Sequence, residues 1–116
     1  MKTMQAEELK KILTGDPVAR VINVLDADAY REKHIPGTVN IPVQDSNFVD
    51  KVENLVENKT KPVVVYCAST DCNASEKAAE KLERAGFQDV RDFAAGTRGW
   101  EASGYQLAGR EAAGAR

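Results

Sequence analysis

A buried strand that ends in a cysteine is the feature that most limits what this chain can fold into. Residues 63–66 read Val-Val-Val-Tyr, and Cys67 follows them directly. β-Branched and aromatic side chains favour strands, and a run with no outward-facing polar position is typical of a central parallel strand. The stretch therefore predicts an α/β fold in which helices cover both faces of a sheet.

A helix is expected soon after this strand, so Cys67 should lie in the turn between the two. Apolar side chains follow the helical period over residues 78–85, and Asn73 with Glu76 has the spacing of a capping box. Ligands of open α/β sheets bind at the carboxyl ends of strands, where backbone N–H groups and the helix dipole favour an anion. We therefore expect these groups to lower the pKa of the Cys67 thiol toward neutrality.

Other strands and helices alternate along the chain. Helices are predicted at residues 3–13, 26–33, 46–58 and 97–103, and strands at residues 18–25, 38–41 and 89–93. Thr3 is expected to cap the first helix. The alternation predicts a mainly parallel sheet with helices on both faces. Residues 1–107 should form one domain and residues 108–116, which lack an apolar period, a disordered tail.

Composition and charge exclude several classes of function. The net charge is −2 and no stripe of Lys and Arg is present, which argues against nucleic acid or an anionic membrane as partner. The longest apolar run, residues 62–68, is too short to cross a bilayer, and the first residues lack a signal peptide's apolar segment. The expected location is the cytoplasm.

The cysteines also bear on function. In a reducing compartment, two thiols in one loop, Cys67 and Cys72, are expected to be functional rather than a structural disulfide. Together with His34, the only histidine, they fall short of the four ligands of a structural zinc site. Neither a metal nor another cofactor is therefore expected.

Several segments resemble, in order and spacing, the signatures of rhodanese-like domains. They are His34–Pro42 (His-Ile-Pro-Gly-Thr-Val-Asn-Ile-Pro), the strand and cysteine at 63–67, the helix that continues to Gly86-Phe87, and the closing Ala95-Gly96 with Trp100 and Gly104-Tyr105. The resemblance runs from about Thr3 to Leu107. It implies a five-stranded α/β fold and a cysteine, Cys67, that carries a persulfide sulfur from a donor to a thiophilic acceptor. His34 and Trp100 are then expected to be structural.

Three features depart from the pattern of that family. The usual Asp-Val-Arg after the first apolar strand is Asn23-Val24-Leu25 here, so its local ion pairing should be lost. In the family, an arginine or another polar residue occupies one position of the loop, and that position falls on Cys72 here. If Ser75 is instead matched to the family's helix start, the loop is longer and the position falls on Ala74. The loop contains Asp71 and no cation, so a dianion such as thiosulfate would have only backbone N–H groups and the helix dipole as partners. Efficient turnover of thiosulfate is not expected.

The leading hypothesis is a rhodanese-type sulfurtransferase that works without a cofactor. Cys67 would be the nucleophile, and the substrate-binding loop would comprise Ala68, Ser69, Thr70, Asp71, Cys72 and Asn73. The expected partners are a small sulfur donor, either thiosulfate or a persulfide, and a thiol or protein acceptor. Arg98, which follows the last strand, either is solvated or lies near the mouth of the site.

Other functions remain open. Three roles are open for Cys72: a resolving thiol for an oxidised Cys67, a second sulfur relay, or an inert loop residue. Five residues of curled loop can bring the two Cα atoms within the roughly 4.4–6.8 Å that a disulfide allows. Such a pair would make a redox switch. A cysteine phosphatase would need an arginine six residues after Cys67, where this chain has Asn73. A non-catalytic binding module is disfavoured, because rhodanese-like domains of that kind usually lack the cysteine.

Overall fold

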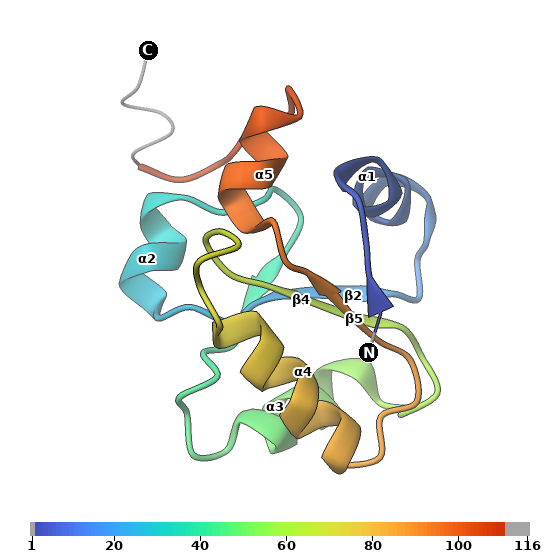
Figure 1. The fold of residues 1–116 in the computed structure, drawn as a ribbon. Helices are drawn as coiled ribbons and strands as arrows, with labels where there is room; N and C mark the ends of the chain where they lie inside the picture. The colour runs from blue at the N-terminus through green and yellow to red at the C-terminus, as the bar shows by residue number, and fades with distance from the viewer. Residues whose placement is uncertain (1, 111–116) are drawn as a thin grey trace.

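A five-stranded parallel sheet forms the centre of the fold in a computed structural model that describes residues 2–110 (Figure 1). The strands are β1 Lys2–Thr3, β2 Arg20–Asn23, β3 Val39–Asn40, β4 Val63–Tyr66 and β5 Val90–Phe93. Their order in the sheet is β1-β5-β4-β2-β3, and each neighbouring pair is parallel. β4 lies in the middle and all its residues are buried, as its composition predicts.

Helices cover both faces of this sheet. They are α1 Ala6–Gly15, α2 Ala27–Glu32, α3 Phe48–Val56, α4 Ala74–Arg84 and α5 Gly96–Ala102. α3 and α4 lie on one face, where Phe48 and Leu82 join one half of the core. α1 and α5 lie on the other face, where Leu9 and Trp100 join the second half (Figure 1). The predicted α/β fold, with a parallel sheet between helices, is confirmed.

Helix starts and the first strand differ from the sequence prediction. β1 has only two residues, both exposed, so no apolar pattern marks it. Thr3, predicted to cap the first helix, pairs instead with Asp92 of β5, and the Glu8 side chain accepts the N–H of Gln5 at the start of α1. Asn73 precedes α4, but its side chain makes no capping hydrogen bond because its backbone (φ −102, ψ 9) is not extended.

The end of the described chain is tied to the loop before β3. His34 and Ala108 exchange two backbone hydrogen bonds, of 2.9 and 2.8 Å. The prediction of a disordered tail concerns mainly residues 111–116, which lie outside the described residues.

A buried amide, Asn23, and a half-buried one, Asn40, join β2 to β3 at the place where the sequence departs from the usual Asp-Val-Arg. The Asn23 Oδ1 accepts the N–H of Leu25 at 3.0 Å. The Asn40 side chain donates to the carbonyl of Asn23 at 3.1 Å and to that of Leu25 at 2.8 Å. Hydrogen bonds between uncharged groups therefore connect the ends of β2 and β3, at the position where the family's ion pairing was expected to be lost. The fold is retained without that ion pairing.

Tyr66 connects the central strand to the His-Ile-Pro-Gly segment. Its hydroxyl accepts the N–H of Ile35 at 3.0 Å and lies 2.8 Å from Oγ1 of Thr38. All three groups are buried, and burial raises the pKa of the Tyr66 hydroxyl. This phenol therefore satisfies a backbone donor that water cannot reach.

We predict that Tyr66→Phe lowers the free energy of unfolding by about 1–3 kcal/mol, because the Ile35 N–H loses its partner inside the protein. Urea denaturation would measure the loss. Tyr105→Phe is the matched control, since the Tyr105 ring stacks on Trp100 but its hydroxyl has no hydrogen bond within the described chain. Equal losses in the two variants would contradict the role given to the Tyr66 hydroxyl.

Candidate functional site

Cys67 begins the loop between β4 and α4, at the carboxyl edge of the sheet. Its side chain has no exposed surface. The sulfur lies 3.5 Å from the carbonyl oxygen of Cys72 and 3.5 Å from the hydroxyl of Ser75, in the first turn of α4. The loop of residues 68–73 therefore curls over the thiol, in the predicted order of strand, thiol, loop and helix.

The start of α5 holds the beginning of this loop from the other side. The N–H of Thr97 donates to the Cys67 carbonyl at 3.1 Å, and the N–H of Arg98 donates to that of Ala68 at 2.9 Å. The Thr97 hydroxyl also donates to the Ala68 carbonyl, at 3.2 Å. Gly96 has φ +63, and a Cβ built on it would lie 2.4 Å from the Cys67 oxygen. The start of α5 therefore fixes the peptide that follows Cys67. The sequence analysis did not predict this role for Thr97.

The two thiols have pKa values shifted in opposite directions. Burial raises the pKa of Cys67, and the contact with the Cys72 side chain adds to this, outweighing hydrogen bonds to the hydroxyl and N–H of Ser75. Burial also acts to raise the pKa of Cys72, but hydrogen bonds from the Cys67 thiol and from the N–H groups of Ala74 and Ala68 outweigh it, and this pKa is lowered. The prediction of a lowered pKa for Cys67 is therefore wrong while the loop is closed, because the sulfur is buried away from water.

The other predicted loop residues differ in exposure. Ser69 is half-buried, and its carbonyl accepts the N–H of Cys72 at 3.0 Å, which turns the loop back on itself. Thr70, Asp71 and Asn73 are exposed. Arg98 is also exposed, and its backbone bond to the loop places it at the rim of the site.

His34 and Trp100 make structural contacts. The Nδ1 of His34 lies 2.8 Å from the carbonyl oxygen of Tyr30, and the two rings stack with centroids 4.0 Å apart. Trp100 is buried, and its indole N–H donates to the carbonyl of Gln106 at 2.9 Å. Neither ring contacts a thiol in these interactions.

Residues 2–110 contain neither a cluster of side chains that could hold a metal ion nor a helix that could span a membrane. These residues contain no group of three or more His, Cys, Asp and Glu side chains placed to hold a metal ion. None of the helices among them combines the length and apolar character needed to cross a membrane.

Asp92 is a member of the site that the sequence analysis missed. It lies in β5 with 5% of its surface exposed, and its Oδ1 has no hydrogen-bond partner. Burial raises the pKa of the Asp92 carboxyl, a hydrogen bond with Ser75 opposes this, and the negative charge of Glu76 adds to it. A single carboxylate in a short strand has no signature in a sequence, so only the fold reveals that Ser75 lies between it and Cys67.

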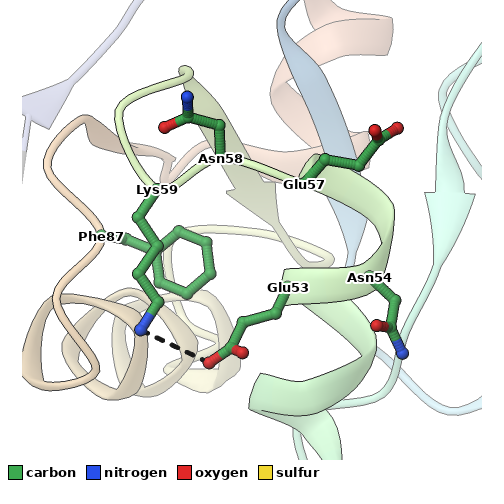
Figure 2. A pocket seen from close by; sticks show the side chains of 6 residues that line it. All are labelled: Glu53, Asn54, Glu57, Asn58, Lys59 and Phe87. Atoms are coloured by element: carbon green, nitrogen blue, oxygen red, sulfur yellow. Dashed lines mark ion pairs between the residues drawn. The ribbon is translucent and has the colours of Figure 1, made fainter.

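A separate pocket of about 350 Å³ lies at the opposite edge of the sheet (Figure 2). Its lining includes Lys59, which donates to the Ala85 carbonyl at 2.6 Å and lies 3.5 Å from a carboxylate oxygen of Glu53. Residues 57–59 of its wall precede β4, whereas Cys67 follows that strand. The pocket is therefore distinct from the thiol site, and its lysine is already engaged by protein groups.

Comparison with known proteins identifies the family. A family model of the rhodanese-like domain matches residues 5–103. The chain belongs to this family. The putative sulfur carrier protein YrkF of Bacillus subtilis is 30% identical over 94 residues, which cover 81% of this chain and 48% of YrkF. The thiosulfate sulfurtransferase GlpE of Pseudomonas savastanoi is 31% identical over 86 residues, which cover 73% of this chain and 74% of GlpE.

A solved structure supports the same fold for this rhodanese-like domain. The BH2092 protein of Bacillus halodurans superposes with a TM-score of 0.81 at 29% identity, over 95% of this chain and 78% of the other. The chain spans only about half the length of YrkF, which is 48% covered. At the level of the family, the names of YrkF and GlpE support sulfur transfer as the type of activity.

We predict that Gly96→Ala destabilises this rhodanese-like domain more than Gly104→Ala does, by about 1–3 kcal/mol. Both glycines have positive φ (+63 and +92), so both substitutions strain the backbone. Only at Gly96 would the new methyl group meet the Cys67–Ala68 peptide, because nothing lies within 4 Å of a Cβ at Gly104. Thermal unfolding of both variants would test this, and similar losses would contradict the close contact.

Proposed function

We propose that this domain is a sulfurtransferase that carries a sulfane sulfur as a persulfide on Cys67. The observation that best supports the proposal is the environment of the Cys67 sulfur. It lies at the carboxyl edge of the sheet, 3.5 Å from the hydroxyl of Ser75 at the start of α4, and the hydroxyl and N–H of Ser75 act to lower the pKa of this thiol. These donors suit a sulfur that becomes negative when it attacks a donor or holds a terminal sulfur.

The reaction needs no cofactor. The Cys67 thiol loses its proton, and the thiolate attacks the outer sulfur of the donor. The S–S bond of the donor breaks, and its electron pair leaves with sulfite or with a thiolate. A bond between Sγ and the transferred sulfur has then formed. An acceptor thiolate next attacks that sulfur, and the electron pair of the broken bond returns to Cys67.

Access to the sulfur depends on the loop. Because the Cys67 side chain has no exposed surface, a donor reaches it only when residues 69–73 move away. The loop has exposed side chains at Thr70 and Asp71, whereas the Ala68 carbonyl is held by α5. A protein acceptor would meet the same exposed residues. Chemistry of this kind needs free thiols, which fits a reducing compartment such as the cytoplasm.

A thiol–disulfide switch is the second candidate, supported by the contact between the two thiols. The Cys67 sulfur lies 3.5 Å from the carbonyl oxygen of Cys72, and the interaction between the two thiols helps to lower the pKa of Cys72. Cys72 is also the more exposed of the two. The expected roles are therefore reversed relative to the sequence hypothesis: Cys72 is oxidised first, and Cys67 resolves it.

We predict that Cys67→Ser abolishes sulfur transfer and leaves the fold intact, since serine fits the space of the thiol. Mass spectrometry after treatment with a low-molecular-weight persulfide should show one added sulfur on Cys67 in the parent protein. The same added sulfur should persist in Cys72→Ser and be absent in Cys67→Ser. Sulfur carried by Cys72 in the Cys67→Ser variant would show that the nucleophile is assigned to the wrong cysteine.

We further predict that mild peroxide closes a Cys67–Cys72 disulfide, seen in the intact mass as the loss of two hydrogen atoms and reversed by a dithiol reductant. Cys67→Ser should then accumulate sulfinic acid on Cys72 faster than Cys72→Ser accumulates it on Cys67, because Cys72 has the lower pKa and the greater exposure. If single-cysteine variants over-oxidise no faster than the parent, the thiols do not protect each other and the switch is refuted.

A further inference from the structure

A buried carboxyl group lies behind the sulfur of this site. Asp92 is 5% exposed and Ser75 is 2% exposed, and the Ser75 hydroxyl contacts both Asp92 and the Cys67 sulfur. The Asp92 Oδ1 has no hydrogen-bond partner. Its negative charge also acts to raise the pKa of Cys72, so the carboxyl is close enough to influence the second thiol too.

We propose that Asp92 is a specificity-determining residue of the sulfur site: its buried charge opposes a second negative charge at Cys67 and so selects against dianionic sulfur donors such as thiosulfate. The statement about donors rests on the proposed sulfurtransferase function. The statement about charge at Cys67 does not, because it concerns the thiol alone.

The first part of the argument is the single proton of the Ser75 hydroxyl. A hydroxyl donates one hydrogen bond and accepts others. When Asp92 is ionised, the Ser75 hydroxyl donates to the carboxylate and is left to accept from the Cys67 thiol, which favours the neutral thiol. When Asp92 is protonated, the same hydroxyl is free to donate to a thiolate or a persulfide. The charge of Asp92 thus acts on Cys67 through Ser75 as well as through space.

The second part is the lack of a compensating charge around Asp92. The titratable groups that interact with it are Glu76, in the first turn of α4, and the Cys72 thiol, while Cys67 is reached through Ser75. Its register partners in the neighbouring strands are Val65 and Thr3, which carry no charge. Like charges repel, and the burial of Asp92 limits the screening of its charge by water. Asp71 on the loop adds to the negative charge near the entrance, and Arg98 at the rim is exposed to solvent.

Alkylation of Cys67 with two probes tests the charge directly. Iodoacetamide is neutral, iodoacetate is an anion of nearly the same size, and both react by the same displacement. Both need the same opening of the loop, so the ratio of their rates reports the charge at the sulfur. Every protein in the series carries Cys72→Ser, which leaves one thiol. Asp92→Asn should raise the ratio of iodoacetate to iodoacetamide rates about tenfold at neutral pH.

Two measurements support that comparison. Asp50→Asn removes an exposed carboxylate from α3, where water screens the charge, and should leave the ratio within about twofold. The Cys72→Ser protein without further change should show a ratio that falls as rising pH ionises Asp92, and this fall should vanish in Asp92→Asn. The pH series tests the same charge without altering Asp92. A ratio that neither Asp92→Asn nor pH changes would overturn the proposal.

Sulfur transfer tests the selectivity. In the protein with both cysteines, Asp92→Asn should raise kcat/KM for thiosulfate at least about fivefold more than for a low-molecular-weight persulfide. A raised alkylation ratio with unchanged donor preference would refute Asp92 as a specificity determinant. If neither donor loads sulfur on any variant while Asp92→Asn still raises the alkylation ratio, the proposed function is overturned. The effect of the Asp92 charge on Cys67 would remain established.

Discussion

The hydrogen bonds from the start of α5 to the carbonyl groups of Cys67 and Ala68 hold the first peptide of the loop in place, and the rest of the candidate site depends on them. β4 is buried on both faces, so its end has a fixed position in the molecule. Thr97 and Arg98 then fix the first peptide of the loop, and Gly96 lets the two backbones approach. With that peptide held, the chain has to turn over the sulfur to reach α4, which is why Cys67 has no exposed surface.

This closure decides the chemical state of the thiol. Backbone N–H groups at an exposed helix start stabilise an anion by about 0.3–1 kcal/mol, whereas full burial can shift a pKa by several units in the opposite direction. The effect of burial is therefore the larger one at Cys67, and the pKa of the Cys67 thiol is raised. Movement of the loop that admits a donor would also bring water to the sulfur, which removes the cause of the raised pKa while Ser75 still lies beside it. Access and activation of Cys67 are thus linked to the same movement.

Much of the fold could be predicted from the sequence, because the signals are strong where side chains are buried. Residues 63–66 predicted a central strand and the helical period after them predicted α4, and both are present. β1 could not be predicted, since its two exposed residues join the sheet only through backbone pairing with β5.

The candidate site was less predictable, since it depends on contacts between distant parts of the chain. The position of Cys67 followed from the order of strand and helix. The direction of its pKa shift did not, because it depends on how tightly the loop closes. Asp92 could not be found either, because its position beside Ser75 depends on the packing of β5 against α4.

The second thiol shows why the charge of this loop matters to the choice of donor. The N–H groups of Ala74 and Ala68, which could hold an anionic donor, help to lower the pKa of the Cys72 thiol. A thiolate at Cys72 would therefore occupy the place that the sequence assigned to a bound dianion. An anionic donor would have to displace it, against the charge of Asp92 behind Cys67 and of Asp71 on the loop. Under the proposed function, a donor of low charge would meet less of this opposition, so the arrangement that lowers the pKa of Cys72 would also favour such donors at Cys67.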